Sequence, residues 1–166
     1  MGRKLAILLP VLLLGLLLDL VSKLLVLKYL PLGGQVPVIK GLFSLVHIHN
    51  RGAAFGLLAN FSADFARIFF IATTSLVILV VGYLWWRSLA SRWQASLGYS
   101  LIMTGALGNL IDRVRLGEVV DFLDFHWGPY HWPAFNVADS MVCLGAGLLV
   151  WVILREEKGA HVSRTP

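Results

Sequence analysis

The chain has 166 residues, of which 58% are hydrophobic and 14% are charged, whereas about 25% of the residues of a soluble domain are charged. So few charged side chains cannot cover the surface of a soluble protein, and the composition therefore predicts a single integral membrane domain over residues 1–166. The net charge of +5 comes from basic residues that mostly flank apolar runs, which favours anionic membrane lipids over nucleic acid as the partner.

Four apolar segments are long enough to cross a bilayer as helices. They cover residues 5–27, 65–86, 93–111 and 135–154. The first follows Arg3 and Lys4, a start that is shared with secretory signal peptides, but the segment is long enough to span and no small-x-small cleavage site follows it. We therefore interpret it as a retained transmembrane helix.

The lengths of the connections predict the topology. With four spans, the long connections 28–64 and 112–134 must lie on one side of the membrane, and both termini must lie on the other with the short link 87–92. Because Arg3 and Lys4 precede the first span directly, we expect the termini in the cytoplasm and the long connections outside it.

The first long connection has its own structural pattern. Residues 35–39 and 42–49 are rich in β-branched and aromatic side chains, and Lys40 and Gly41 between them favour a turn, which predicts a β-hairpin at the membrane surface. The apolar stretch 53–61 is too short to span and predicts a short interfacial helix, while residues 155–166 are polar and predict a disordered tail. The fold class that follows is a mainly α membrane protein with four transmembrane helices, a small extracytoplasmic β-hairpin and a short interfacial helix.

Ionisable and amide side chains inside the spans are costly and therefore informative. In the first span, Asp19 and Lys23 lie four residues apart and can pair on one helical face. The third and fourth spans each contain a pair of polar residues three positions apart, which also share a helical face. Glycines in the third span allow a neighbouring helix to approach closely. These residues are Gly105, Gly108, Asn109 and Asp112 in the third span, and Asn136 and Asp139 in the fourth.

All of these polar groups fall toward the side of the long connections, which add Asn50 and Asp121. Two carboxylates in one partly buried site cannot both ionise cheaply, so one keeps its proton and the pair offers a general base and a general acid. That arrangement suits an aspartic hydrolase. The residues leave three alternatives open: helix caps at Asp112 and Asp139, a structural polar network, or an ion path of a small transporter or channel subunit lined by Asp19, Lys23 and Asp139.

Metal and covalent chemistry are not favoured by the residues. The histidines that could bind a metal lack a recognisable ligand spacing, and the single cysteine, Cys143, excludes a Cys-based zinc site and an internal disulfide. These histidines are His47, His49, His126 and His131, with Asp124 close to the last two in sequence. A Ser-Lys pair is disfavoured because Asp19 holds Lys23 charged. We expect no metal and no organic cofactor.

Five segments, taken together and in this order, resemble the bacterial lipoprotein signal peptidases, the signal peptidase II family. They are Asp19-Leu-Val-Ser22-Lys23, Asn50-Arg51-Gly52-Ala53-Ala54-Phe55, Gly105-Ala-Leu-Gly108-Asn109-Leu-Ile-Asp112-Arg113, Val120-Asp121-Phe122 and Phe135-Asn136-Val-Ala138-Asp139-Ser140. The resemblance implies that Asp121 and Asp139 are the catalytic pair. It implies supporting or substrate-binding positions at Asp19, Lys23, Asn50, Gly52, Gly108, Asn109, Arg113, Asn136 and Ala138.

The resemblance further implies an intramembrane aspartic endopeptidase of the bacterial cytoplasmic (inner) membrane. Such an enzyme removes signal peptides from diacylglyceryl-modified prolipoproteins by cutting just before the lipidated cysteine, needs no cofactor, and is blocked by globomycin. We expect a monomer whose active site faces the extracytoplasmic leaflet. Two positions depart from the family pattern, because Leu20 stands where Gln is usual and Arg51 where Thr is usual.

Overall fold

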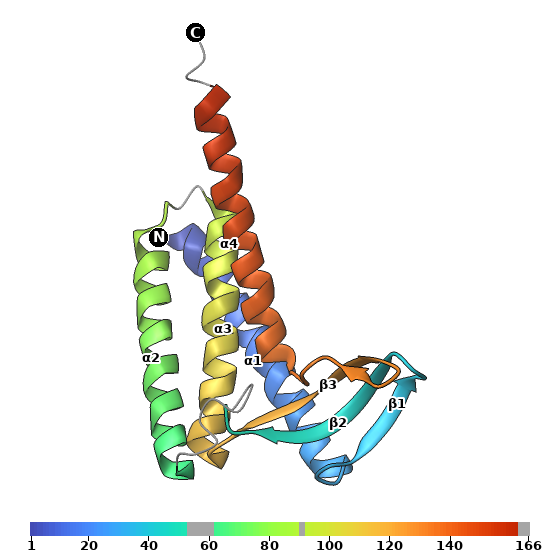
Figure 1. Cartoon of the computed structure of the whole chain (residues 1–166). Coiled ribbons are helices and arrows are strands. Elements are labelled where there is room, and N and C mark those ends of the chain that lie inside the picture. The colour runs from blue at the N-terminus through green and yellow to red at the C-terminus, as the bar shows by residue number, and fades with distance from the viewer. Residues whose placement is uncertain (53–61, 90–91, 163–166) are drawn as a thin grey trace.

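Four long helices stand side by side, and a small antiparallel sheet extends from one end of them (Figure 1). This computed structural model describes residues 1–52, 62–89 and 92–162, with side chains described as far as residue 156. In chain order, the elements are α1 (Gly2–Tyr29), β1 (Gln35–Ile39), β2 (Phe43–Asn50), α2 (Ala63–Arg87), α3 (Trp93–Leu116), β3 (Val119–Trp127), β4 (Tyr130–His131) and α4 (Val137–Val162).

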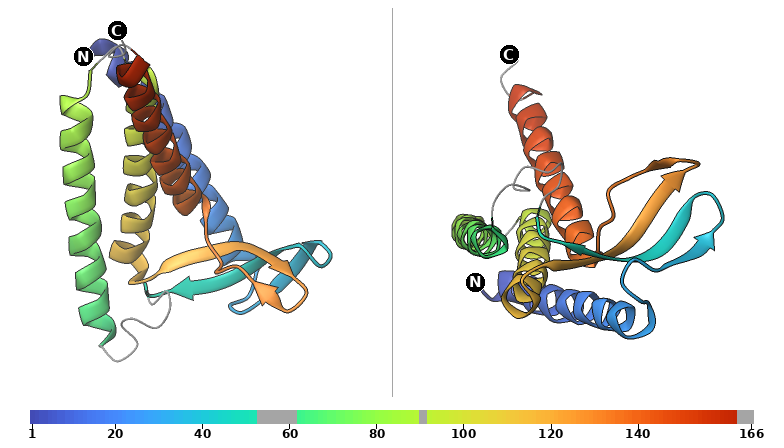
Figure 2. Two further views of the ribbon diagram at one scale, coloured as in Figure 1. Left: turned by 45° about the horizontal axis from the view of Figure 1, so that its top comes forward. Right: turned by 60° about the horizontal axis from the view of Figure 1, so that its bottom comes forward.

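Helix α3 lies between the other helices of the bundle and contacts each of them (Figure 2). Among the described residues, α1, α2 and the Val137–Glu156 part of α4 are long and apolar enough to cross a membrane. Helix α3 is of similar length, but it carries buried Ser96, Ser100 and Thr104. The hydroxyls of Ser100 and Thr104 donate to the carbonyls four residues earlier, both at 2.7 Å, so these polar groups are satisfied without water. A central helix that its neighbours shield from lipid needs less apolar surface than the three around it.

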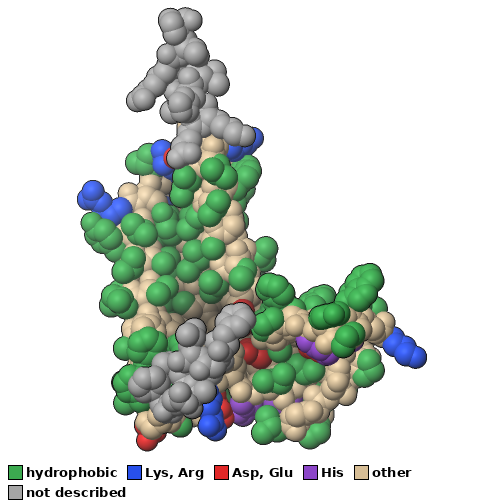
Figure 3. Space-filling view, viewed as in Figure 1, with side chains coloured by type: hydrophobic (Ala, Val, Ile, Leu, Met, Phe, Trp, Pro, Cys, Tyr) green, Lys and Arg blue, Asp and Glu red, His purple; other side chains and the backbone are tan. Residues whose placement is uncertain are grey.

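The bundle is held at the end opposite the sheet by the N-terminus of the chain. Lys4 is buried, and its ammonium donates to the carbonyls of Trp85, Trp86 and Ser88 at the end of α2. The last carbonyls of a helix lack the amide partner four residues later, and the negative end of the helix dipole favours a cation there. In the space-filling view, charged side chains gather toward the two ends of the bundle and leave a hydrophobic band between them (Figure 3).

Glycines allow α3 and α4 to pack backbone against backbone. A Cβ on Gly105 would lie 2.2 Å from the carbonyl oxygen of Ala138, and a Cβ on Gly145 would lie 2.6 Å from that of Gly98. Gly108 plays the same part toward α1, because a Cβ there would lie 2.5 Å from Oδ2 of Asp19. The close approach expected at Gly105 and Gly108 is therefore present, and it brings the polar faces of the three helices together.

The sheet has the strand order β1-β2-β3-β4, with each neighbouring pair antiparallel. Gly41, with φ of +79°, lies in the turn of the expected hairpin β1-β2, where glycine adopts left-handed backbone at little cost. Strand β3 packs against the end of α1 through Val26, Val120 and Phe122. This contact fixes β3, and with it Asp121, across the end of the bundle.

Several expected boundaries need correction. The loop expected at 112–134 contains β3 and β4, the helix expected to end at 111 continues to Leu116, and the tail expected from 155 is helical as far as Val162. Hydropathy marks only the part of a helix that lies in lipid, so helices extend beyond the predicted spans. Helix α4 begins at Val137, two residues later than predicted. The interfacial helix expected at 53–61 lies outside the described residues.

The packing of α3 on α4 yields a stability prediction. Gly105→Ala inserts a methyl group against the Ala138 carbonyl and should cost about 1–3 kcal/mol, seen as a lower unfolding temperature in detergent. Gly147→Ala is the matched control, because nothing lies within 4 Å of a Cβ built on Gly147 and alanine favours a helix interior. Equal unfolding temperatures for the two variants would contradict the close approach.

Candidate active site

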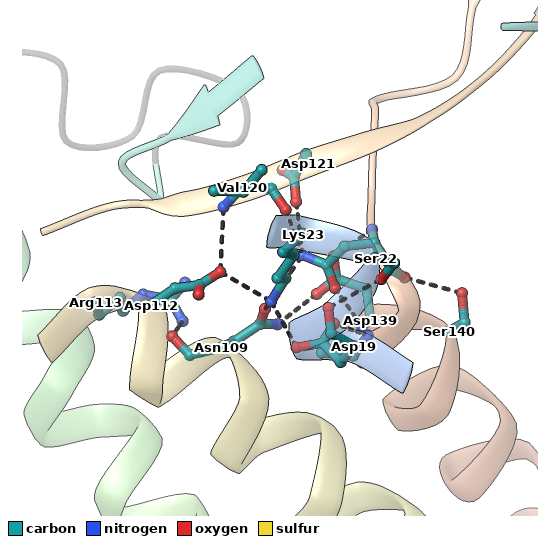
Figure 4. Close-up of polar contacts among 12 residues, drawn as sticks. Asp19, Ser22, Lys23, Asn109, Asp112, Arg113, Val120, Asp121, Asp139 and Ser140 are labelled. Atoms are coloured by element: carbon teal, nitrogen blue, oxygen red, sulfur yellow. Dashed lines mark hydrogen bonds and ion pairs between the residues drawn. The ribbon is translucent and has the colours of Figure 1, made fainter. Parts of the chain in front are cut away.

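A single ammonium group ties two helices together beneath the sheet. The Nζ atom of Lys23 lies 2.8 Å from Oδ2 of Asp19 and 2.9 Å from Oδ2 of Asp112, and it donates to Oδ1 of Asn109 at 3.1 Å. Figure 4 shows Lys23 reaching from α1 toward Asn109 and Asp112 on α3. Lys23 is 2% exposed and Asp19 0%, so the three acceptors replace the water that the ammonium loses on burial.

The two carboxylates that bind Lys23 also hold backbone of the neighbouring elements. Oδ1 of Asp19 accepts from the amide of Ala138 at 2.9 Å, in the first turn of α4. Oδ2 of Asp112 accepts from the amide of Val120 at 3.3 Å, in β3. The cluster therefore joins α1, α3, α4 and β3, and it fixes the two segments that carry Asp121 and Asp139.

Asparagine side chains connect Asp121 and Asp139. The amide of Asn136 donates to Oδ1 of Asp121 at 2.8 Å, and the amide of Asn109 donates to Oδ1 of Asp139 at 2.7 Å. The two asparagines are themselves joined, because Nδ2 of Asn136 lies 3.2 Å from Oδ1 of Asn109. From the neighbouring strand, Asn50 at the end of β2 donates to Oδ2 of Asp121 at 2.9 Å.

The start of α4 explains why Asp139 is held in place. Oδ1 of Asn136 accepts from the amide of Asp139 at 2.9 Å, and Oδ2 of Asp139 accepts from the amide of Asn136 at 3.1 Å. This reciprocal arrangement has the form of a capping box, which satisfies backbone donors that a helix start leaves unpaired. The helix-cap alternative for Asp139 is therefore correct as geometry, and its second oxygen, Oδ1, still faces the cluster.

The two carboxylates differ in burial. Asp121 is 2% exposed, and Asp139 is partly exposed. Burial raises the pKa of Asp121 to about 6, and the charge of Asp139 adds to this rise, although hydrogen bonds from Asn50 and Asn136 oppose it. A carboxyl group with such a pKa can exchange a proton near neutral pH.

Asp139 borders a cavity of about 310 Å³ between α2, α3 and α4. Its lining includes Thr73, Thr74, Val77, Ile102, Ala106, Asn109, Arg113, Asp139, Val142 and Cys143. The lining is mostly apolar, with Asn109, Arg113 and Asp139 at its polar end, an arrangement that can hold an apolar ligand next to a carboxylate. Arg113 lies at the polar end, where its Nη1 donates to the carbonyl of Asn109 at 3.3 Å.

Gly52 is packed rather than open. Its φ is +88°, and a Cβ on it would lie 2.1 Å from the ring of Phe70 on α2, while the guanidinium carbon of Arg113 lies 5.2 Å from the centre of the same ring. Gly52 and Arg113 thus contact one aromatic side chain from two elements. The amide of Gly52 also donates to Oδ1 of Asn50 at 2.7 Å, which turns the chain away from the end of β2.

The structure brings the predicted residues into one cluster, with Arg113 and Gly52 at its edge. Within the described residues, no group of three or more metal-type side chains lies close enough to hold an ion. Asp112, expected among the polar groups of the third span, binds Lys23. One further participant was not expected: Glu118, which binds His49 and Arg51. The spacing of Asp112 to Asn109 indicates its place on the polar face of the third span, whereas Glu118 has no sequence signal.

Comparison with known proteins gives consistent matches. The family model described as signal peptidase (SPase) II, Peptidase_A8, matches residues 11–155. The chain is 46% identical over 144 residues to the lipoprotein signal peptidase of Geobacter metallireducens, covering 87% of this chain and 88% of that protein. It is 46% identical over 147 residues to that of Aeromonas hydrophila, covering 88% and 87%.

Two solved structures share the fold. Both are of a bacterial membrane enzyme studied by the in meso method, at 2.3 Å and 1.9 Å resolution. The first has a TM-score of 0.78 and 28% identity, covering 96% of this chain and 92% of that one. The second has a TM-score of 0.76 and 31% identity, covering 93% and 94%.

The role of Lys23 can be tested through stability. Lys23→Met leaves Asp19 and Asp112 facing each other without a cation, and removing one partner of a buried ion pair costs about 3–5 kcal/mol. We expect a much lower unfolding temperature in detergent, partly restored by adding Asp19→Asn, because an asparagine oxygen can still accept from Ala138. Lys40→Met, at an exposed turn residue, is the control. A Lys23→Met variant as stable as this control would contradict the role.

Proposed function

The chain belongs to the signal peptidase II family, and we propose that Asp121 and Asp139 are the catalytic pair with which it cleaves prolipoproteins. As a member of this family it is an aspartic-type lipoprotein signal peptidase. The substrate class that we propose is the diacylglyceryl-modified prolipoprotein, cut just before the lipidated cysteine.

One observation carries the assignment of the pair. Asn136 touches both carboxyl groups, through its side-chain amide to Asp121 at 2.8 Å and through its backbone amide to Asp139 at 3.1 Å. Asn136 thus holds two carboxyl groups, one that is buried and one that borders a cavity. Such a pair can share a proton. Asp19 and Asp112, by contrast, are bound to Lys23, which supports a structural role for them.

The proposed mechanism follows from the difference in burial. The shared proton resides on the more buried Asp121, because burial disfavours its charged form. Asp139 accepts hydrogen bonds from Asn109 and from the amide of Asn136, and these stabilise its carboxylate. Asp139 then takes a proton from a water molecule that attacks the scissile carbonyl, while Asp121 donates a proton to the carbonyl oxygen. As the C–N bond breaks, Asp139 gives its proton to the departing nitrogen and a hydroxyl of the intermediate returns a proton to Asp121. No covalent acyl-enzyme forms, and no cofactor is required.

The position of the site suits a lipidated substrate. Strand β3 and the start of α4, which carry the pair, lie at the end of the bundle next to the sheet, away from the start of α1 (Figure 1). With the termini in the cytoplasm, the pair faces the extracytoplasmic leaflet of the bacterial cytoplasmic membrane, where a diacylglyceryl group holds its cysteine. Asparagines 109 and 136 and Arg113 then support the site, and anionic lipids contact the basic ends of the helices. We propose a monomer.

The alternative of an ion path has less support. Asp19 and Lys23 are buried and bound to each other at 2.8 Å, so neither presents a free charge to a passing ion. The polar cluster of the described residues lies where the helices meet strand β3 (Figure 4).

Cleavage by the purified protein tests the pair directly. We expect a diacylglyceryl-modified prolipoprotein to be cut at the lipidated cysteine, and globomycin to block this reaction. Asp121→Asn and Asp139→Asn should each lower the rate by at least about a thousandfold, which corresponds to roughly 4 kcal/mol of lost transition-state stabilisation, while both variants keep the unfolding temperature of the wild type. Near-normal turnover by either variant would remove that residue from the pair.

The pH dependence tests the direction of proton transfer. Because Asp121 is proposed to act in its protonated form and burial raises its pKa to about 6, kcat/KM should fall as the pH rises through this region. The apparent value belongs to the pair rather than to one residue, and kcat/KM reports the free enzyme. Activity that instead rises through the same pH range would assign the base to Asp121 and contradict the mechanism.

A further inference from the structure

One carboxylate outside the catalytic pair holds both chain neighbours of Asn50. Oε1 of Glu118 lies 2.9 Å from Nδ1 of His49, and Oε2 of Glu118 accepts from Nε of Arg51 at 2.9 Å. Asn50 stands between these two residues and donates to Asp121 at 2.9 Å. Glu118 therefore clamps the backbone on either side of the residue that contacts the catalytic carboxyl.

The clamp also joins the two strands that carry these residues. Glu118 directly precedes β3, which begins at Val119 and contains Asp121, and Asn50 pairs with Val119 in the antiparallel register. Successive side chains of a strand point to opposite faces, so His49 is directed to the face opposite Asn50. An interaction on one face of the sheet thus sets the distance between Asn50 and Asp121 on the other.

A histidine chain anchors the clamp to α1. Nε2 of His49 lies 3.0 Å from Nε2 of His47, and Nδ1 of His47 lies 2.8 Å from the carbonyl oxygen of Leu30. A carbonyl oxygen and a carboxylate can only accept, so the Nδ1 atoms of both histidines donate. His47 is buried, and the chain Leu30–His47–His49–Glu118 fixes the clamp to the end of a transmembrane helix.

The electrostatics favour an ionised Glu118. Burial raises the pKa of Glu118, but the hydrogen bonds and charges of His49 and Arg51 outweigh this effect, so the pKa lies below its ordinary value. Its side chain is 21% exposed and that of Arg51 67%. The charged groups that border the same small cavity are Arg51, Asp64 and Arg67. An ionised acceptor with two donors forms the stronger class of hydrogen bond.

We propose that Glu118 is a positioning residue for the peptidase reaction, which holds the Asn50 amide against Asp121 through His49 and Arg51. The inference rests on the proposed catalytic role of Asp121. Without Glu118, the end of β2 is released and Asn50 no longer donates consistently to the carboxyl of Asp121. Because that hydrogen bond favours the ionised form, its loss raises the pKa of Asp121.

The experiment compares Glu118→Ala with Asn50→Ala, with the double variant and with Glu156→Ala. Glu156 is a matched control, because it forms an ion pair with Arg92 at 2.9 Å and is 44% exposed. We expect Glu118→Ala to lower kcat about tenfold, equivalent to one weakened charged hydrogen bond, and to move the falling limb of kcat/KM to higher pH. Glu156→Ala should do neither. The double variant should be no slower than Asn50→Ala alone, because both changes remove the same contact.

Two further measurements keep the test decisive. Arg51→Thr removes one of the two donors to Glu118 and leaves His49 bound, so it should give a smaller loss of kcat and a smaller shift of the same limb. This variant serves if Glu118→Ala does not fold, as judged by its unfolding temperature. The proposal would be overturned if the losses of kcat in Glu118→Ala and Asn50→Ala added in the double variant. It would also be overturned if the pH at which kcat/KM falls did not change in Glu118→Ala. If the wild-type protein itself fails to cleave, or if Asp121→Asn remains active, the proposed function fails instead.

Discussion

The ammonium group of Lys23 is the interaction on which the rest of the site depends. A charge at this depth in a membrane protein is costly unless it is paired, and here it meets two carboxylates and one amide oxygen. The same two carboxylates accept hydrogen bonds from the backbone amides of Ala138 and Val120 and so hold these two residues in place. A buried ion cluster need not raise the free energy of unfolding, but it allows only one arrangement of the elements that carry its members. Here the arrangement is the position of α4 and β3, the two elements that carry the aspartate pair.

Asparagine suits the connection between this cluster and the pair, because its side chain both donates and accepts without adding charge. Asn109 accepts from Lys23 and donates to Asp139, so it stands between a cation and a carboxylate. An aspartate in its place would put a further negative charge beside Asp139, and an apolar residue would leave Lys23 with one acceptor fewer. Close approach of the backbones at Gly105 and Gly108 is what lets side chains this short reach.

The sequence predicted the helices and most of the cluster because both depend on short-range spacing. Asp19 and Lys23 pair at four residues, and Asn136 and Asp139 bond at three, as a helix requires. Strand β3 was interpreted as a loop because Val119, Val120, Asp121 and Phe122 are buried in succession, so the alternation that marks a half-exposed strand is absent. Glu118 could not be found, since its partners lie 67 and 69 residues away.

The pair draws its two carboxyl groups from different kinds of element, and this has a chemical consequence. Asp139 belongs to the first turn of a helix beside an apolar cavity, whereas Asp121 belongs to a strand that lies over the end of the bundle. Hydrolysis at a membrane surface needs an apolar path for the peptide and a polar boundary for water. Helices alone can line an apolar path, because their backbone groups are hydrogen-bonded within the helix. In the proposed mechanism, the strand adds the second carboxyl group from the side of the sheet, so that the reacting bond lies between the apolar cavity and the aqueous face. In the same proposed mechanism, the clamp on Asn50 keeps that strand close enough for the two aspartates to act as one acid–base pair.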